Sequence, residues 1–439
     1  MVESVVVAAT DSSYPAIEAI WRIESARVIA GLTRMVGDVG LAEELAQDAF
    51  VIALEQWPDE GVPPNPGGWL MSTAKHRAID LVRRRATYEQ KLQQLGRRLP
   101  AHHEPDLDEA LDDQIGDDLL QLIFMACHPV LSAEARAALT LRLLCGLTTD
   151  EIARGFLTAE PTVGQRIFRA KRTLATKGVR FEMPAPADLP ARLSSVLEII
   201  YLVFNEGYSA TAGGDWTRPA LCEEALRLGR ILAGLMPAEP EVHGLVALME
   251  LQASRLRART APSGEPVLLL DQNRARWDRL LIRRGLEALE RAESLEGPIG
   301  PYTLQAAIAA CHARAPVPEA TDWERIAALY TVLAHVMPSP VVDLNRAIAV
   351  GMAYGPAKGL EILDTLTLDG YAQLPAARGD LLARLGRAAE ARAEFERAAA
   401  MTRNERERAI FERRAAGLGT AEISAEPPAV PGRTPPDPR

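Results

Sequence analysis

The chain has few cysteines and no long apolar run. Its cysteines, Cys127, Cys145, Cys222 and Cys311, lie far apart, and their spacing indicates neither a zinc site nor a disulfide framework. We expect them to be small buried apolar side chains in a reducing compartment. No stretch of about 18 apolar residues occurs, and no basic segment precedes the short apolar run near the N-terminus. We therefore expect a cytoplasmic protein without a membrane span or a secretory signal.

Strand-like alternation is almost absent, and aromatic residues make up only 5% of the chain. Apolar residues instead recur at helical spacing in most windows, and Ala, Leu, Arg and Glu favour helices. We therefore predict an all-α fold. The sequence also lacks a phosphate-binding loop, a cluster of metal ligands and a paired nucleophile and base. We accordingly predict no catalytic residue, no metal site, no cofactor and no enzymatic activity.

The net charge of −10 bears on DNA binding. A protein that binds DNA unaided is usually basic, because neutralising phosphates and releasing counterions supply much of the affinity. If this chain contacts DNA, we expect it to do so through local basic patches and with the help of a partner.

Three breaks divide the helical pattern. They are a Pro- and Gly-rich loop at 63–68, a polar and increasingly acidic stretch at about 87–116, and a Pro-containing hinge at 183–186. We predict helical domains at 10–87, 113–180 and 190–420, with an acidic linker at 88–112 between the first two. The Pro-rich tail at 421–439 is expected to be disordered.

The first block contains two amphipathic helices. In the stretch 41–54, apolar residues form one face, and polar residues lie on the other side: Glu43, Glu44, Gln47 and Asp48. In the stretch 69–85, the apolar face is formed by Leu70, Ala74, Ala78, Leu81 and Val82. The polar face of that second helix carries a basic stripe of Lys75, His76, Arg77, Arg83, Arg84 and Arg85.

This basic stripe has two interpretations. It is typical of a phosphate-binding surface, and Trp69 at its start could stack on an unpaired base. Alternatively, it is a solvated basic helix end that the helix dipole favours, with Trp69 in the core.

The second block predicts a helix-turn-helix. Thr148 and Glu151 form a capping box at the start of one helix, and Pro161 suits the first turn of the next. We expect a buried stripe on the second helix, formed by Val163, Ile167, Ala170 and Leu174. The second helix of such a motif presents its N-terminal residues to base edges in the major groove. The candidate readers are Thr162, Gln165, Arg166 and Arg169; the alternative is a generic helical hairpin.

Three ordered stretches resemble the extracytoplasmic-function sigma factors of RNA polymerase. The stretch 42–50 looks like the family's sigma-2 core-binding motif, 69–85 like its promoter −10 motif, and 146–174 like its sigma-4 motif. Two departures stand out. His76 occupies a position where the family usually has Asn, and Gly164-Gln165 replaces a more usual Lys-Ser pair, so the −35 sequence cannot be transferred.

The resemblance implies partners and roles. Core RNA polymerase would be bound through its β′ clamp helices and its β subunit, and promoter DNA would be the second partner. The acidic linker would thread the polymerase cleft. The residues implied for the β′ clamp are Glu44, Gln47 and Asp48. Those implied for the −10 element are Trp69, Lys75, His76, Arg77, Arg83, Arg84 and Arg85. Those implied for the −35 element are Thr162, Gln165, Arg166, Arg169, Lys171 and Arg172.

In the C-terminal region, the stretches 201–208, 271–278 and 344–350 resemble the extension of one sigma subgroup, which contains tetratricopeptide-like repeats. Small residues such as Ala391 and Ala398 fall where two helices must approach closely, and Phe395 would fill the space between them. A degenerate repeat occurs at 347–363. We predict an α-solenoid whose curved surface could bind a peptide or another domain.

Polar and aromatic residues interrupt the apolar helices of this region. They could bind a regulatory ligand or protein, or they could form a buried polar network that locks helices together. These residues are Asn205, Glu206, Tyr208, Asp271, Arg274, Arg276, Trp277 and Asp278.

Together these observations predict a sigma-2 bundle, a sigma-4 helix-turn-helix and a tetratricopeptide-like solenoid that regulates the sigma module in cis. Two alternatives stay open. One is a stand-alone helix-turn-helix regulator, which the acidic balance disfavours. The other is a repeat-type adaptor with a vestigial DNA-binding half, which the intact basic runs disfavour.

Overall fold

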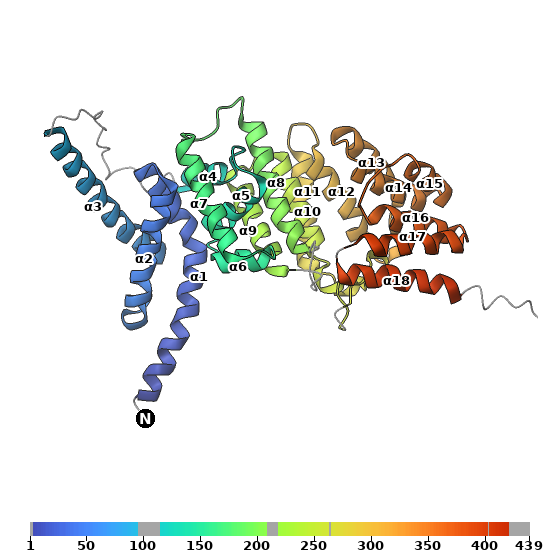
Figure 1. Ribbon diagram of the computed structural model, residues 1–439, viewed down its shortest axis with the longest axis horizontal. Coiled ribbons are helices and arrows are strands. Elements are labelled where there is room, and N and C mark those ends of the chain that lie inside the picture. The colour runs from blue at the N-terminus through green and yellow to red at the C-terminus, as the bar shows by residue number, and fades with distance from the viewer. Residues whose placement is uncertain (1–2, 95–114, 209–217, 263–264, 403, 421–439) are drawn as a thin grey trace, which may run out of the picture. The chain divides into compact units, whose positions relative to one another are not determined.

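The computed structural model describes residues 3–94, 115–208, 218–262, 265–402 and 404–420, with side chains beginning at Tyr14 and omitted for 81–94 and 419–420. Within these ranges the backbone forms α-helices, short 3₁₀ helices and an isolated β-bridge between Thr260 and Pro266 (Figure 1). The predicted all-α fold is confirmed. Most of the expected acidic linker, and almost all of the expected Pro-rich tail, lie outside the described residues.

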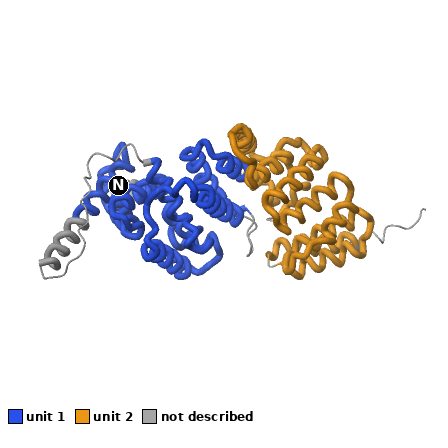
Figure 2. Tube along the Cα trace, turned by 90° about the horizontal axis from the view of Figure 1, so that it is seen from above, with its two compact units in different colours: residues 1–209, 218–249 blue, residues 210–217, 250–439 orange. Residues whose placement is uncertain are grey.

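The chain divides into two compact units (Figure 2). Unit 1 comprises residues 1–209 and 218–249, and unit 2 comprises residues 210–217 and 250–439. The expected C-terminal domain at 190–420 therefore contributes its first helices to unit 1 and the rest to unit 2.

Unit 1 begins with three helices, α1 (Glu3–Val36), α2 (Val39–Glu60) and α3 (Pro66–Gln94). Gly37, with φ of 70°, lies between α1 and α2, and the Asp38 side chain caps α2 by accepting from the Leu41 backbone N–H at 2.9 Å. The α1–α2 core is apolar and almost fully buried. It includes Val28, Ile29, Leu32, Ala42, Leu45, Ala46 and Ala49.

Four shorter helices follow: α4 (Ile115–Ala126), α5 (Ala133–Leu144), α6 (Thr149–Gly155) and α7 (Glu160–Thr176). The predicted capping box at the start of α6 is confirmed, because the side chains of Thr148 and Glu151 each accept from the other residue's backbone N–H. The predicted apolar stripe of α7 is also confirmed, since all four of its residues are buried: Val163, Ile167, Ala170 and Leu174.

The next helices of unit 1 are α8 (Leu189–Tyr208), α9 (Pro219–Leu235) and most of α10 (Pro240–Ala253). Side chains of α8 and α9 donate to the backbone carbonyls that end α4 and α5. Arg192 bonds the Phe124 carbonyl at 2.6 Å, Ser195 bonds that of Cys127 at 2.7 Å, and an Arg227 guanidinium N bonds that of Leu144 at 2.7 Å. Because such carbonyls have no partner within their own helix, these bonds tie α8 and α9 to α4 and α5.

In the part of unit 2 that the structure describes, eight α-helices begin, along with short 3₁₀ segments. The helices are α11 (Arg279–Ser294), α12 (Pro301–Arg314), α13 (Trp323–Val336), α14 (Pro340–Tyr354), α15 (Pro356–Leu363), α16 (Gln373–Arg384), α17 (Ala388–Met401) and α18 (Glu405–Thr420). The 3₁₀ segments are η1 (Leu256–Ala258), η2 (Leu269–Asp271), η3 (Arg274–Arg276) and η4 (Pro318–Ala320). Each long helix packs chiefly against its neighbours in sequence, as in a helical repeat.

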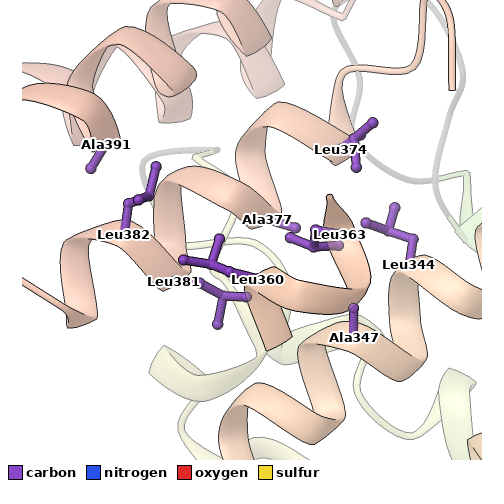
Figure 3. Close-up of a cluster of buried hydrophobic side chains, with 9 residues drawn as sticks. All are labelled: Leu344, Ala347, Leu360, Leu363, Leu374, Ala377, Leu381, Leu382 and Ala391. Atoms are coloured by element: carbon purple, nitrogen blue, oxygen red, sulfur yellow. The ribbon is translucent and has the colours of Figure 1, made fainter. Parts of the chain in front are cut away.

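Small residues allow the helices of unit 2 to approach closely. A Cβ added at Gly359 would lie 2.7 Å from the Ala347 carbonyl O and 2.9 Å from the Cα of Gly351. A Cβ at Gly379 would lie 3.1 Å from the ring of Phe395, which is 1% exposed. Leu344, Leu360, Leu363, Leu374, Leu381 and Leu382 gather around this packing with alanines between them (Figure 3). The predicted role of Phe395 as a filler between close helices is confirmed.

All four cysteines are buried, as predicted, and none of them forms a disulfide. Burial raises the pKa of the Cys127 thiol to about 11 and raises that of Cys145 further. Among the described residues, no helix is long and apolar enough to cross a membrane.

Candidate nucleic-acid interface

Helix α7 buries one face and exposes the other. Thr162, Gln165, Arg169 and Arg172 are exposed, and Arg166 is partly exposed, on the side away from the buried stripe. From Pro161 to Arg180 the sequence has no acidic residue. Five of the six residues predicted to contact the −35 element therefore share an accessible basic face, which suits contact with base edges and phosphates.

Phe168 also lies on this accessible face, and the sequence prediction missed it. Its side chain is 64% exposed, although it belongs to a helix with a well-defined apolar stripe. It follows Gln165 by three residues and precedes Arg169, so it shares their face. This register could have identified it, because Phe168 falls outside the spacing of Val163 and Ile167.

The sixth residue, Lys171, is held differently. Its side chain is 22% exposed, and its ammonium group pairs with the carboxylate of Glu43 on α2. Glu43 also accepts from the Arg142 Nε on α5 at 2.6 Å and from the Gln47 amide at 2.5 Å. Glu43 lies on the predicted polar side of α2, but other helices cover this part of the helix, and its side chain is only 4% exposed.

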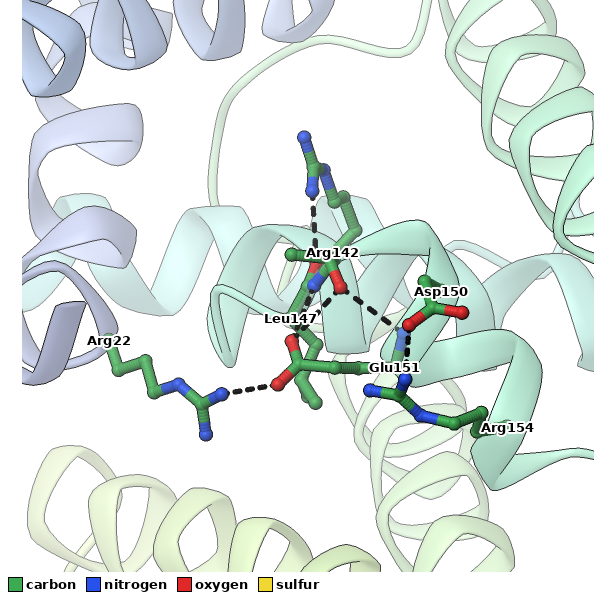
Figure 4. A network of polar contacts seen from close by, with 7 residues as sticks. Arg22, Arg142, Leu147, Asp150, Glu151 and Arg154 are labelled. Carbon is green, nitrogen blue, oxygen red and sulfur yellow. Dashed lines mark hydrogen bonds and ion pairs between the residues drawn. The ribbon is translucent and has the colours of Figure 1, made fainter. Parts of the chain in front are cut away.

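A second polar contact joins α1 to α6. Arg22 pairs with Glu151, and nearby Arg154 pairs with Asp150, while Arg142 donates to the Leu147 carbonyl at 3.1 Å (Figure 4). Burial by itself would raise the pKa of Glu151. Hydrogen bonds from Thr148 and the charge of Arg22 together outweigh burial and lower that pKa. Glu151 therefore stays ionised and serves both as a helix cap and as an ion-pair partner.

The three residues predicted for the polymerase clamp lie along one side of α2. Glu44 and Asp48 are exposed, and Gln47 is partly exposed. Asp48 pairs with Arg77 of α3 at 2.5 Å, so a predicted clamp residue touches a predicted −10 residue. The two predicted surfaces are therefore adjacent on unit 1.

The basic stripe of α3 is only partly described. His76 and Arg77 are exposed, Lys75 is half-buried, and the His76 Nδ1 lies 2.7 Å from the Ser72 carbonyl O. Trp69 packs edge-on against the buried Trp57, with ring centroids 5.2 Å apart, and retains partial exposure. The side chains of Arg83, Arg84 and Arg85 lie outside the described residues.

The polar residues predicted near the end of α8 make contacts within unit 1. Glu206 forms an ion pair with Arg218, and the ring of Tyr208 stacks on Phe204 at 5.7 Å. Arg218 also donates to the carbonyl of Gly155 at the end of α6, at 2.8 Å. Asn205 is exposed.

The predicted residues of unit 2 surround a buried arginine. One Arg274 guanidinium N donates to the carbonyls of His312 and Ala315 at 2.6 Å, and the other donates to the Thr321 hydroxyl at 3.1 Å. The guanidinium also lies 5.0 Å from the ring centre of Trp277. These contacts are structural, because they join η3 to the end of α12 and to Thr321.

The remaining predicted residues of unit 2 lie around this arginine. Asp278 caps α11 by accepting from the backbone N–H groups of Leu280 and Leu281, whereas Asp271 and Arg276 are exposed. Within the described residues, no group of three or more His, Cys, Asp or Glu side chains could hold a metal ion.

Comparison with known families gives this arrangement a context. The family described as sigma-70 region 2 matches residues 22–88, and sigma-70 region 4 matches residues 121–174. This protein belongs to the sigma-70 family, among its extracytoplasmic-function members. A family of unknown function (DUF6596) matches residues 192–293, which contain α8 to α11 of the C-terminal extension of this sigma factor.

Several proteins share sequence with this sigma factor. An uncharacterized protein of Rhizobium meliloti is 43% identical over 412 residues, covering 92% of this chain and 95% of that protein. The probable ECF RNA polymerase sigma factor SigI of Mycobacterium tuberculosis is 26% identical over 37% of this chain and 56% of its own length. The ECF RNA polymerase sigma factor SigK of Mycolicibacterium vanbaalenii is 28% identical over 34% of this chain and 74% of its own length.

Among solved structures, yeast Tom70 aligns with 97% of this chain and 88% of its own, at 12% sequence identity and a TM-score of 0.31. At this score the likeness carries no weight for either the fold or the function.

Proposed function

We propose that this sigma factor binds core RNA polymerase, directs it to specific promoters in the cytoplasm, and is regulated in cis by its C-terminal extension. The observation that supports the proposal is the exposed basic face of α7. The apolar stripe of this helix is buried within its own domain, so the opposite face can contact DNA, as a recognition helix does. The proposed domains are a sigma-2 domain at 10–87 and a sigma-4 domain at 113–180, joined by the linker at 88–112 and followed by the extension at 190–420.

Contact with DNA is proposed for α7 and α3. On α7, Arg169 and Arg172 suit guanine or phosphate, Gln165 suits adenine, and Phe168 offers an apolar contact to a thymine methyl group. On α3, Lys75 and Arg77 would contact the −10 element. The net charge of −10 limits unaided binding, so promoter reading would depend on the polymerase.

Contact with polymerase is proposed for the exposed acidic side of α2. Glu44 and Asp48 lie one helical turn apart on this side, so their carboxylates would face a basic surface together. A basic partner would compete with Arg77 for Asp48.

Cis regulation is supported by the contacts that α8 and α9 make with the helix-turn-helix. Arg218 binds the Gly155 carbonyl at the end of α6, and a Cβ added to Gly155 would lie 3.2 Å from the side chain of Leu221 on α9. Any ligand or partner that shifts α8 or α9 would therefore act directly on the element that carries α7. A regulatory protein or ligand for the extension is part of this proposal.

Run-off transcription tests the DNA-reading proposal. Purified core polymerase with the full-length protein should produce specific transcripts from the gene's own upstream region. Replacing both Arg166 and Arg169 with Ala should abolish them, because each side chain would contribute base or phosphate contacts worth about 1–3 kcal/mol. Arg283→Ala, which removes an equally exposed arginine from α11, is the matched control and should leave transcription unchanged.

Two further variants separate polymerase binding from regulation. The double variant Glu44→Arg, Asp48→Arg should weaken binding to core polymerase at least tenfold, whereas Glu60→Arg, at the end of α2, should not. Arg218→Ala should change transcript yield at least threefold without changing core affinity. Equal transcription by Arg218→Ala and wild type would argue against cis regulation through this contact. If the wild-type protein does not bind core polymerase, the proposed sigma function is wrong.

A further inference from the structure

A short stretch of unit 2 is strongly basic, although the whole chain has a net charge of −10. Between residues 255 and 284 there are eight arginines and only three acidic residues. The stretch contains the 3₁₀ segments η1, η2 and η3 and the first turns of α11. All the predicted DNA contacts lie outside it. The arginines are Arg255, Arg257, Arg259, Arg274, Arg276, Arg279, Arg283 and Arg284.

The core of unit 2 holds η1 beside η3. The Asp278 N–H, just after η3, donates to the Ser254 carbonyl, just before η1, at 2.8 Å. The guanidinium carbons of Arg255 and Arg274 lie 5.8 Å and 5.0 Å from the ring centre of Trp277, which is buried. The backbone that carries the remaining arginines is therefore fixed by buried contacts, and not by the arginines that face solvent.

Four arginines of this stretch are exposed and have no ion-pair partner in the part of the chain that the structure describes. We call these four the arginine patch: Arg257 of η1, Arg276 of η3, and Arg279 and Arg284 of α11. Arg283 is not part of the patch, because it pairs with Glu287 one turn further along α11, at 3.7 Å. The patch therefore joins three separate segments into one cationic surface.

The acidic residues of the stretch offset only part of this charge. Glu265 is paired with Arg413 of α18 at 2.9 Å, and the Asp278 side chain caps α11. Arg279 is the first residue of α11, where the partial positive charge of the helix N-terminus disfavours a cation. Because this position works against helix stability, we looked for its purpose outside the fold.

We propose that the arginine patch is a second DNA-binding surface, which lies on the extension and contacts the phosphates of duplex DNA without reading their sequence. A guanidinium stays charged and can donate two parallel hydrogen bonds to one phosphate. Phosphate contacts carry no sequence information, and the four arginines lie on three segments and not along one helix that could enter a groove. The net charge of −10 does not prevent this contact, because charges more than about 8 Å away are largely screened at physiological salt.

This inference goes beyond the proposed function and relies on it only for bringing DNA to the protein. Binding of the full-length protein to a fluorescent duplex of scrambled sequence tests it without polymerase. The double variant Arg276→Gln, Arg279→Gln should bind about tenfold more weakly than wild type at low salt. The plot of log affinity against log salt concentration should also become shallower by about 1.8, because each lost phosphate contact removes about 0.9.

A matched double variant separates the patch from the total charge. Arg325→Gln, Arg384→Gln removes two exposed arginines from α13 and α16, so its net charge equals that of the patch variant. It should keep the wild-type affinity and salt dependence. Far-UV circular dichroism and thermal melting establish that both variants are folded. Equal weakening by the two double variants, or no weakening by the patch variant, would overturn the proposal.

Photo-crosslinking shows whether the extension itself touches DNA. A photoreactive amino acid replaces Ala275, which is exposed in η3, or Ala328, which is exposed on α13, or Phe168 on the proposed reading helix. Positions 275 and 168 should crosslink to the duplex, and position 328 should not. The crosslink from position 275 should be lost when Arg276 and Arg279 are replaced with Gln.

The crosslinks also separate the two proposals. Crosslinking from position 168 but not from 275 would overturn the patch and leave the proposed function standing. Crosslinking from 275 but not from 168 would count against α7 as the reading helix and support the patch. Binding of polyglutamate but not of duplex DNA, lost in the patch variant, would assign the surface to an acidic protein and overturn the DNA-binding proposal.

Discussion

The junction between α2 and α7 and the packed helices of unit 2 join helices by opposite means. The junction depends on a buried carboxylate and two cations, whereas α14 to α17 depend on leucines, alanines and glycines in van der Waals contact. An ionic junction is weakened by dissolved ions, which screen its charges. An apolar junction is not screened in this way, because van der Waals contacts carry no net charge. We therefore expect salt to weaken the junction in unit 1 and to leave the packing of unit 2 unchanged.

The largest effect is expected from Phe395→Ala in unit 2. Phe395 of α17 is 1% exposed and packs against residues of α16 and α18, so its removal leaves a cavity and should lower the free energy of unfolding by about 4 kcal/mol. Denaturant unfolding measures this, and the loss should be the same in low and high salt. Leu385→Ala, at a 40% exposed position, is the control and should change stability by about 0.5 kcal/mol or less. A loss that depends on salt would contradict the conclusion that apolar packing holds these helices of unit 2 together.

A smaller loss should follow from filling the closest helix approach. Gly359→Ala places a Cβ 2.7 Å from a backbone carbonyl O, so α14 and α15 must separate, at a cost of about 2 kcal/mol. Gly417→Ala, on α18, meets nothing within 4 Å and should stabilise the protein by about 0.5–1 kcal/mol. Thermal melting of both variants checks the opposite signs. Stabilisation by both variants would show that helix propensity, and not close packing, sets the result.

In the ionic junction, Arg142→Met should lower the free energy of unfolding by about 2 kcal/mol, because the buried Glu43 loses one cation but keeps Lys171 as a partner. The difference from wild type should shrink as salt rises from about 0.1 to 1 M, since ions screen the remaining charges. Denaturant unfolding at both salt concentrations measures it. A difference that does not change with salt would mean that Arg142 stabilises the junction through packing and not through its charge.

The smallest expected effect, counted for each pH unit, is a pH dependence of the free energy of unfolding that arises in unit 2. Burial, followed by the charges of Arg255 and Arg274, lowers the pKa of His312 from 6.5 to about 3. The unfolded chain therefore takes up a proton between pH 6.5 and about 3 while the folded chain does not. Above pH 6.5 the contribution of His312 to the free energy of unfolding does not change with pH. Below pH 6.5 this contribution falls by about 1.4 kcal/mol for each pH unit.

His312→Asn should remove this slope, whatever its effect on stability at pH 7. Denaturant unfolding of both proteins between pH 4.5 and 7.5 measures the slope directly. Parallel curves for wild type and variant would mean that other groups set the acid sensitivity of unit 2.

Much of the fold could be predicted because its signals are local. The capping box at Thr148 and Glu151, the first-turn Pro161 and the buried stripe of α7 depend on residues within one or two helical turns. Phe395 was predicted for the same reason, since Ala391 and Ala398 lie within two turns of it. Spacing along a helix fixes which side chains share a face, before any partner is known.

Glu43 shows where that reasoning stops. Its spacing placed it correctly on the polar side of α2 with Glu44, Gln47 and Asp48, but the two adjacent glutamates have opposite surroundings. Glu43 is buried by residues 99 and more positions away, while Glu44 is exposed. Spacing identifies a polar face, but it does not say which part of that face another domain will cover.

The sequence by itself determined the helices, their faces, the helix-turn-helix and the close packing of the repeat, because each follows from short-range periodicity and capping. The tertiary structure alone decided that Lys171 is withheld in an ion pair while Arg169 remains accessible. It also decided that Arg218 ties the extension to α6, and that Arg274 serves as an internal lock. These outcomes depend on which distant surfaces meet, since a charged side chain is stable when buried only where partners from other segments complete its hydrogen bonds.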